Sequence, residues 1–457
     1  MSHLYRSGLI IAVMILATSQ LPFAQAQNNW PQFRGAQSLG TTDDPRLADH
    51  WSATENVRWK QDIPGSGWSC PVTWGNRVFV TTVVNRGDTE KPRKGLYFGG
   101  ERPDPPKSIH EWRVVCLDLN DGQVLWNKQV HEGAPESSIH MKNTFASETP
   151  VTDGERVYAY FGNLGVYCLT VDGEPVWSQR WPVYKTNSGW GTGASPVLHG
   201  DKLLVLNDNE ESSFLVALDK LTGKELWRTP RDDKSGWSTP FVWTNPIRSE
   251  IIASGDGKVR SYDLDGHQLW EIGNMSRNAI PTPFAKDDLL YVTSGHVMNK
   301  FKPLMAIRPG AKGDITLADD KTTNDYVVWC QKTAAPYNPT PVLYDNKVYV
   351  CLDGGFFACY DAKTGEAIYT KKRIPNGKAF TASPFAYNGK VFCLNEDGTT
   401  FVIPANGNFE VLYTNPLAED DMCLATPALV DGKLLIRTAA RVYCIESSDA
   451  KKTASAN

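Results

Sequence analysis

The sequence predicts an all-β protein, an eight-bladed β-propeller of four-stranded antiparallel blades, closed by an N-terminal strand that completes the last blade. Three observations predict this fold. A unit with the same opening and closing residues recurs along the chain, each unit contains four short apolar runs, and one closing strand stands alone near the start. Repeats of roughly 40–45 residues with four strands each are typical of propeller blades.

Each unit opens with serine or threonine followed by proline, and it closes with tryptophan or tyrosine. The openers are Thr149-Pro150, Ser195-Pro196, Thr239-Pro240, Thr282-Pro283, Thr340-Pro341, Ser383-Pro384 and Thr426-Pro427, with Cys70-Pro71 as the eighth. The closers are Trp126, Trp177, Trp227, Trp270, Trp329, Tyr369 and Tyr413. Eight openers therefore face only seven closers, and the missing closer is found upstream, at Trp59.

The sixth unit illustrates the four expected strands, which are residues 340–343, 347–352, 356–360 and 367–370. Turn sequences such as Asp345-Asn346 separate them, as in β-hairpins. The longer D-x-x-T-G turns end in Gly223 and Gly365, where a positive φ favours glycine.

The position of Trp59 predicts how the ring closes. An open ring would leave two sheet edges unpaired. We therefore expect residues 56–63 to supply the outer strand of the final blade, whose other strands lie in 423–446. The closing residues Trp126, Trp177, Trp227 and Trp270 are expected to pack between adjacent blades.

The remaining segments divide the chain into regions. Residues 1–26 are typical of a signal peptide, with an apolar run from Leu9 to Ala17 and an A-x-A cleavage site at Ala24-Gln25-Ala26. We expect an N-terminal extension at 27–55, the propeller at 56–448 and a disordered polar tail at 449–457. Long inserts occupy 83–111 in the first blade and 309–325 in the fifth, and loops of this size are usually functional or mobile.

Composition limits the function classes. The 47 basic and 51 acidic residues nearly cancel and form no basic run, which argues against nucleic-acid binding. No segment after the signal reaches 18 apolar residues, so no membrane span is expected. The predicted product is exported, soluble and monomeric, in the periplasm or outside the cell.

The nine cysteines are interpreted as core residues. No two are adjacent, and four of them (Cys116, Cys168, Cys359 and Cys444) share one repeat position that alanine or serine fills in other units. Such a pattern requires a small buried side chain rather than a disulfide or a metal site.

Candidate binding residues stand before the proline of each opener, where the blades are expected to meet at one mouth of the axial channel. Large side chains here are Trp68, Phe145, Trp190, Trp237, Tyr337 and Phe380, and Glu148 stands beside them. Aromatic rings around one axis offer a platform for a flat ring or a sugar. The alternative is that they fill the channel as core. No catalytic residue and no metal ligand is assigned.

A second candidate group follows the second strand of the third blade. The run from Asn207 to Glu211, which includes Asn209 and Glu210, has alternating oxygen ligands suited to Ca²⁺, although a solvated acidic turn is the favoured interpretation. Arg231, followed by Asp232 and Asp233, is expected to face that turn and to form an ion pair at the surface.

Histidines near the first connection form a weaker group. The spacing of His110, His131 and His140 matches no metal-ligand signature, and a chance cluster on a polar loop is favoured. Arg102, Lys107 and His110 of the first insert offer an alternative, a cationic lip for an anionic glycan.

The repeat, with its Ser/Thr-Pro openings, x-C/A-L-D segment, T-G turn and closing tryptophan, resembles the PQQ-like (quinoprotein-type) β-propeller repeat. The resemblance covers residues 56–446, and the lead-in Trp30-Pro31-Gln32-Phe33-Arg34-Gly35 is similar to that of exported bacterial members. It implies the propeller fold, but the family contains dehydrogenases, scaffolds and sensors.

The dehydrogenases of this family hold a quinone and a Ca²⁺ ion on the axis, under a ring made by two adjacent disulfide-bonded cysteines. This sequence has no adjacent cysteine pair, so their catalytic residues are not carried over. The chain resembles more closely the non-catalytic propeller of the outer-membrane assembly machine, often called BamB. The implied function is a scaffold of the cell envelope that binds a protein, a small molecule or a glycan at its axial face. The alternatives are a PQQ-dependent dehydrogenase with PQQ and calcium, or a polysaccharide-active hydrolase or lyase.

Overall fold

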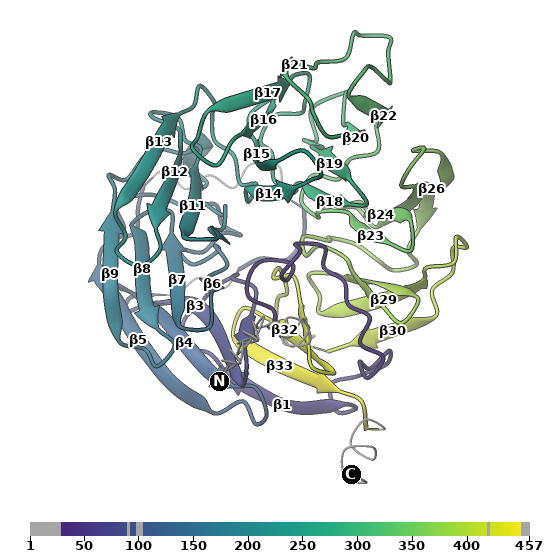
Figure 1. Cartoon of the computed structure of the whole chain (residues 1–457). Coiled ribbons are helices and arrows are strands. Elements are labelled where there is room, and N and C mark those ends of the chain that lie inside the picture. The colour runs from purple at the N-terminus through teal and green to yellow at the C-terminus, as the bar shows by residue number, and fades with distance from the viewer. Residues whose placement is uncertain (1–28, 89–91, 97–103, 418–420, 449–457) are drawn as a thin grey trace, which may run out of the picture.

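The computed structural model describes residues 29–88, 92–96, 104–417 and 421–448, and it contains eight β-sheets arranged radially around one axis (Figure 1). The predicted fold class, an eight-bladed all-β propeller, is confirmed. The signal peptide expected at 1–26 and the tail expected at 449–457 lie outside the described residues. Within the described ranges, no helix has the length and apolarity needed to cross a membrane.

The blades follow one another in chain order, and the strands of each blade are given below from the axis outwards. Blade 1 contains β2 (Val72–Trp74), β3 (Arg77–Asn85), β4 (His110–Asp118) and β5 (Val124–Gly133). Blade 2 contains β6 (Val151–Thr152), β7 (Arg156–Phe161), β8 (Gly165–Thr170) and β9 (Pro175–Arg180), and is followed by the 3-10 helix η2 (Asn187–Gly189). Blade 3 contains β10 (Val197–His199), β11 (Lys202–Asn207), β12 (Phe214–Asp219) and β13 (Glu225–Pro230). Blade 4 contains β14 (Phe241–Thr244), β15 (Ser249–Ser254), β16 (Val259–Tyr262) and β17 (Gln268–Ile272).

The second half of the ring repeats this order. Blade 5 contains β18 (Phe284–Lys286), β19 (Leu289–Thr293), β20 (Leu304–Ile307) and β22 (Val327–Gln331). Blade 6 contains β23 (Val342–Tyr344), β24 (Lys347–Cys351), β25 (Phe356–Asp361) and β26 (Ala367–Arg373). Blade 7 contains β27 (Phe385–Tyr387), β28 (Lys390–Leu394), β29 (Thr399–Pro404) and β30 (Tyr413–Pro416). Blade 8 contains β31 (Ala428–Val430), β32 (Lys433–Arg437), β33 (Arg441–Glu446) and β1 (Val57–Asp62).

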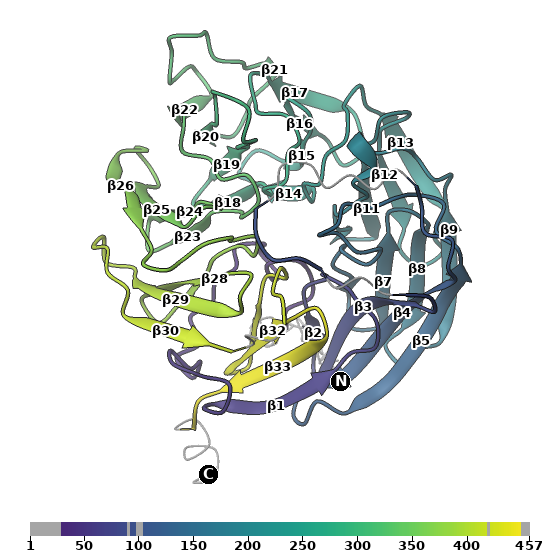
Figure 2. The ribbon, with the colours of Figure 1, turned by 180° about the vertical axis from the view of Figure 1, so that it is seen from behind.

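The two ends of the propeller meet in blade 8. The N-terminal strand β1 lies beside β33 (Figures 1 and 2). The two strands are antiparallel, with Trp59 opposite Cys444. Arg58 pairs with Glu446 at 2.5 Å across the same junction. The sheet therefore combines the first and the last strands of the ring, and neither is left as an unpaired edge.

Tryptophans at the ends of blades pack onto glycines of the next blade. A Cβ atom added to any of these glycines would lie only 2.5–2.8 Å from the indole ring. Each indole also donates its Nε1–H to a backbone carbonyl of the same turn, at 2.9–3.0 Å. The pairs are Trp59 with Gly122, Trp126 with Gly173, Trp177 with Gly223, Trp227 with Gly266 and Trp329 with Gly365. The repeated glycine is therefore needed both for its positive φ and for its lack of a side chain.

Trp270 packs differently from the other closers. It is buried against blade 5 residues such as Leu290 and Val292, but it donates its indole N–H to Glu250 of its own blade, at 2.7 Å. In blade 5 the insert expected at 309–325 takes the place of the usual turn after β20. Within it, β21 (Gly313–Asp314) pairs parallel with β17 and adds a fifth strand to blade 4. The prediction of four strands in every blade is wrong for blade 4, because this insert buries Ile315 and Leu317 against its outer strand.

The opener motif also links neighbouring blades through hydrogen bonds, a role that the sequence pattern did not indicate. Backbone N–H groups of successive openers donate to the hydroxyl of the next opener around the axis, at 2.9–3.0 Å. The donors are Cys70, Thr149, Ser195, Thr282, Thr340 and Ser383. A hydroxyl at this position joins six of the neighbouring blade pairs, which explains why serine and threonine recur before proline.

The N-terminal extension covers the inner ends of several blades. The Arg34 guanidinium is buried and donates to five backbone carbonyls, of which Thr340, Pro341 and Pro384 belong to blades 6 and 7. Further along, Trp51 is fully buried and stacks on Phe392 of blade 7. At its start, Trp30 pairs with Thr73 of blade 1 and the Pro31 carbonyl accepts from the Thr152 amide of blade 2. The described part of the extension therefore joins the first blades to the last ones.

Candidate functional site

The eight connections between consecutive blades meet around the axis and enclose one cavity of about 730 Å³. Every connection contributes at least one lining residue, from Trp68 before blade 1 to Ala425 before blade 8. The first residues of all eight openers line the cavity together with Phe33 of the extension; they are Cys70, Thr149, Ser195, Thr239, Thr282, Thr340, Ser383 and Thr426. The volume lies in the range of sites that hold drug-sized molecules, roughly 300–1,000 Å³.

Four of the six predicted mouth aromatics line this cavity, namely Trp68, Trp190, Trp237 and Tyr337. Phe145 and Phe380 do not, because both are buried in the apolar core between blades. The aromatic positions lie at different distances from the proline of the opener, so the sequence alone does not show which rings turn towards the axis.

Two of the three tryptophans of the lining donate hydrogen bonds to backbone carbonyls. Trp68 donates its Nε1–H to the Lys142 carbonyl at 2.7 Å, and Trp237 donates to the Gly191 carbonyl at 2.8 Å. The rings of Trp190 and Trp237 lie 5.9 Å apart at an angle of 39°, which makes a corner of two aromatic faces. Trp68 and Trp237, held in this way, lose little freedom when a ligand packs against them. Within the described residues the Trp190 Nε1–H has no hydrogen-bond partner, and this ring packs on His140, 5.8 Å away between centroids. We call Trp190 and Trp237 the aromatic corner.

Glu148 does not line the cavity, although it belongs to the connection between blades 1 and 2, which contributes other lining residues. It is buried, accepts a hydrogen bond from the Gly162 amide at 3.1 Å and another from the Thr192 hydroxyl at 2.5 Å. Burial raises the pKa of Glu148 to about 7, against these hydrogen bonds, which favour the charged form. It therefore supports Thr192, which does line the cavity.

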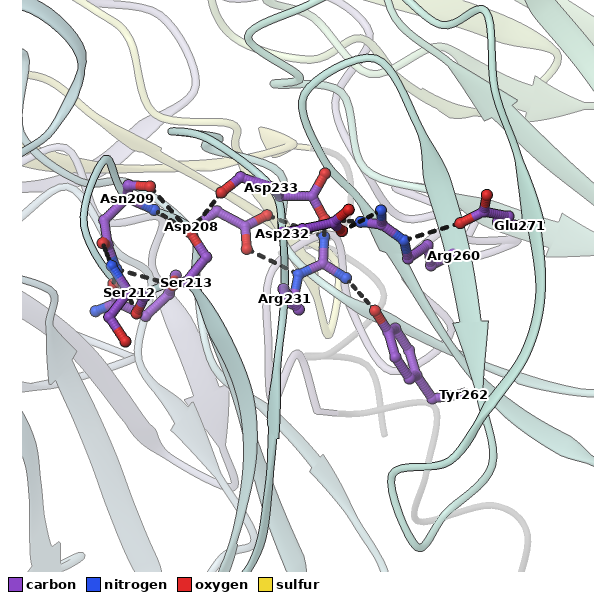
Figure 3. Close-up of polar contacts among 11 residues, drawn as sticks. Asp208, Asn209, Ser212, Ser213, Arg231, Asp232, Asp233, Arg260, Tyr262 and Glu271 are labelled. Atoms are coloured by element: carbon purple, nitrogen blue, oxygen red, sulfur yellow. Dashed lines mark hydrogen bonds and ion pairs between the residues drawn. The ribbon is translucent and has the colours of Figure 1, made fainter.

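Asp208 and Asn209 of the acidic run form a buried network with the Arg231 segment (Figure 3), whereas Glu210 is half-buried and Glu211 is exposed. The Arg231 side chain is inaccessible and pairs with Asp208 at 2.8 Å and with Asp233 at 2.6 Å. Burial alone would lower the pKa of Arg231, but the two carboxylates raise it. The predicted surface ion pair is therefore wrong: the pair lies inside, because the second strand of blade 3 ends beside the connection to blade 4.

Asn209 and Glu210 belong to the same network. The Asn209 carbonyl oxygen Oδ1 accepts from the amides of Glu211 and Ser212, so its side chain shapes the turn. Glu210 accepts from the Ser235 amide at 3.1 Å and from its hydroxyl at 2.7 Å. Neither residue lines the cavity, and together with Arg231 they hold the connection that carries Trp237.

Three acidic residues near the cavity were missed by the sequence analysis or assigned no role there. Asp208, Asp353 and Glu396 follow the second strands of blades 3, 6 and 7 by one or two positions. These three residues could have been found in the sequence, because an acidic residue recurs just after the second, buried strand of each of these blades.

Glu396 is fully buried and forms an ion pair with Lys142, which lines the cavity. It also accepts from the Thr381 hydroxyl at 2.7 Å and from the Gly95 amide at 2.8 Å. The described part of the first-blade insert thus crosses to blade 7, where Lys94 pairs with Asp397 at 3.7 Å.

The histidines do not gather. His110 and His131 pack on Trp112, with ring centroids 6.0 and 5.2 Å away, whereas His140 lines the cavity beside Trp190. Of the expected cationic lip, Arg102 lies outside the described residues, Lys107 is exposed and His110 is buried. In the part of the chain that the structure describes, no three His, Cys, Asp or Glu side chains are grouped to hold a metal ion.

The donor set does not fit a pyrroloquinoline quinone with Ca²⁺. Asp353 is the single carboxylate among the described lining residues, and both its oxygens accept hydrogen bonds from Tyr337 and Asn338. The nine cysteines are buried and none is in a disulfide, and Cys70 is the one among the described lining residues. Calcium requires six to eight oxygen ligands, which these residues do not supply.

Comparisons with known proteins agree with this architecture. A family model described as outer membrane protein assembly factor BamB matches residues 166–298 and 255–409. A polyvinylalcohol dehydrogenase from Pseudomonas sp. is 21% identical over 384 residues, which are 76% of this chain and 50% of that protein. The chain thus spans about half the length of this curated relative.

Two solved structures show the same fold. BamB from Moraxella catarrhalis has a TM-score of 0.53 at 12% identity, covering 84% of this chain and 98% of that one. A quinohemoprotein alcohol dehydrogenase from Comamonas testosteroni has a TM-score of 0.59 at 11% identity, covering 92% of this chain and 81% of that one. At these identities the likeness concerns the fold, which binding proteins and enzymes share.

Proposed function

Because the chain belongs to the PQQ-like β-propeller family, whose matching model is described as outer membrane protein assembly factor BamB, we propose that it is a non-catalytic scaffold of the cell envelope. Its axial cavity binds a small ring-shaped ligand. The observation that carries the proposal is the cavity of about 730 Å³ with the aromatic corner of Trp190 and Trp237 on its wall. Concave sites with rigid aromatic walls and a few polar groups are typical of ligand-binding pockets.

An exported address is part of this proposal. It rests on the signal-like segment at residues 1–26. A partner protein of the envelope is a further element, since the BamB of the matching family is named as an assembly factor.

The lining favours binding over hydrolysis. Hydrolysis of a glycosidic bond ordinarily uses two carboxylates on opposite sides of the bond. Asp353 is the one carboxylate among the described lining residues, and its hydrogen bonds to the Tyr337 and Asn338 amides, at 2.8 and 2.9 Å, occupy it. Glu148 is directed to Thr192 and Gly162.

Binding is tested by tryptophan fluorescence and calorimetry on the purified chain, with a panel of monosaccharides, disaccharides and planar aromatic compounds. Replacement of Trp190 by alanine should weaken binding roughly 5- to 30-fold, because a buried aromatic contact is lost. Trp74→Ala is the matched control, because Trp74 is 38% exposed and lies outside the cavity. Equal effects of the two variants, or no binding by any compound, would overturn the proposal.

A second candidate function is a PQQ-dependent dehydrogenase, favoured by the likeness to the Pseudomonas polyvinylalcohol dehydrogenase. Its test is the purified chain mixed with PQQ and Ca²⁺, an alcohol or aldose, and a dye acceptor. Dye reduction that depends on PQQ would reverse the order of the two candidates. The misfit of the cavity residues to calcium leads us to expect none.

A further inference from the structure

We infer that the ligand of the axial cavity is an acidic saccharide, with its ring against the aromatic corner and its carboxylate on Arg277. This inference rests on the proposed binding function and adds the chemical class of the ligand. It follows from the charged residues that line the cavity, which are Lys142, Asp353 and Arg277.

The first cation of the lining, Lys142, is already neutralised. Its ammonium group forms an ion pair with the fully buried Glu396 and also donates to the Gly95 carbonyl at 2.8 Å. A ligand anion would have to compete with this buried carboxylate. Lys142 therefore contributes little net attraction for a ligand.

The carboxylate of the lining, Asp353, opposes an anion only weakly. It accepts hydrogen bonds from the Tyr337 amide and from the Asn338 amide and side chain. Burial raises the pKa of Asp353 despite these donors. Both oxygens of Asp353 therefore already face N–H donors, and burial disfavours its charged form.

The second cation, Arg277, remains available. It lines the cavity from the connection between blades 4 and 5, is exposed, and has no ion pair or hydrogen bond to a carboxylate in the described part of the chain. The guanidinium group is planar and binds a carboxylate through two parallel hydrogen bonds. Arg277 is thus the one cation of the described lining without an acidic partner.

A second donor lies near this position. His296 lines the cavity with Tyr337, at 5.3 Å between ring centroids. The Met298 amide donates to its Nδ1 at 3.3 Å, which leaves the ring proton on Nε2. Burial lowers the pKa of His296, a hydrogen bond with the Asn299 side chain opposes this, and the charge of Arg277 lowers the pKa further. The ring adds an N–H donor beside the Arg277 guanidinium.

The remaining walls suit a sugar ring. Trp190 and Trp237 offer two aromatic faces at 39°, on which the C–H face of a pyranose can pack. The amides of Asn187 and Asn278 also line the cavity, and the Asn187 side chain donates to Asn278 at 3.3 Å. Hydroxyl groups of a saccharide can bond to such amides, whereas a purely apolar ring would leave them unsatisfied. A uronate combines all three features.

The experiment is calorimetric titration of the full chain with glucuronate, galacturonate, the matching neutral sugars glucose and galactose, and glucose 6-sulfate. We expect the uronates to bind at least about tenfold more tightly than the neutral sugars at low ionic strength. Arg277→Gln should remove this preference, so that the uronates bind no more tightly than the neutral sugars. Arg277→Lys should retain part of it, because the charge stays.

Arg180→Gln is the control, since Arg180 is exposed on the outermost strand of blade 2, far from the cavity lining. Uronates and neutral sugars binding equally would overturn the inference and leave the proposed function standing, as would binding of planar aromatic compounds alone. Binding of the sulfated sugar without the uronates would overturn the carboxylate assignment. Failure of every compound to bind would overturn the proposed function together with the inference.

Discussion

The contact between Gly365 and Trp329 allows a direct test of what holds neighbouring blades together. Gly365 has a φ of +72°, and a Cβ atom there would lie 2.5 Å from the Trp329 ring. Gly389 has a nearly equal φ of +68°, but a Cβ atom there meets nothing within 4 Å. Alanine at either position carries the same backbone penalty, so the difference between the variants isolates the contact with the indole.

The expected magnitudes follow from these two geometries. Gly389→Ala should lower the free energy of unfolding by about 1–2 kcal/mol, the cost of a left-handed conformation. Gly365→Ala should cost that amount and a further ~1–3 kcal/mol, because the ring must move or the blade must shift. Guanidinium denaturation followed by circular dichroism measures both. If the two variants were equally stable, the reasoning about the tryptophan and glycine pairs would be refuted.

Three further substitutions test other parts of the ring. Trp59→Ala should lower the free energy of unfolding by about 3–5 kcal/mol and expose the N-terminal strand to protease, because the indole closes the ring; unchanged limited proteolysis would contradict this. Arg34→Met should cost at least about 3 kcal/mol in chemical denaturation, since five carbonyls lose their donor, and an unchanged midpoint would argue against the role of the extension. The pKa of Glu148 is about 7 in the folded chain, against 4.5 for an ordinary glutamate, so the folded state binds the proton more tightly than the unfolded state. The free energy of unfolding should therefore fall by about 3 kcal/mol as the pH rises between these two values. Glu148→Gln should remove this fall, which stability curves at pH 4 to 8 would show, and an identical pH dependence in the variant would refute the assignment.

Most of the fold could be predicted because recurring residues mark the start, the turns and the end of each repeat. The openers, the glycine turns and the closing tryptophans each recur, so eight blades and their order could be read from spacing alone. The extra strand β21 could not, because the two residues Gly313 and Asp314 carry no strand pattern. Their pairing follows from the burial of Ile315 and Leu317 beside them.

The candidate site was predicted in part. The connections that form the cavity and four of its aromatic residues were identified, since opener positions converge on the axis in any propeller. The directions of Phe145 and Phe380 were not, because a shift of one position along a connection turns a side chain from the cavity into the core. The ion pair of Arg231 with the acidic turn was expected, but its burial was not, because the packing of blades 3 and 4 around it is not visible in the sequence.

The junction of β1 and β33 has a consequence for biogenesis. Arg58 and Glu446, which meet there, are 388 positions apart in the chain. At synthesis rates of roughly 5–20 residues per second, the first strand has to wait about 20–80 s before its neighbour emerges. During that interval the backbone N–H and C=O groups of β1 are unpaired and could associate with other chains. A chaperone that binds extended segments would be needed until blade 8 has formed.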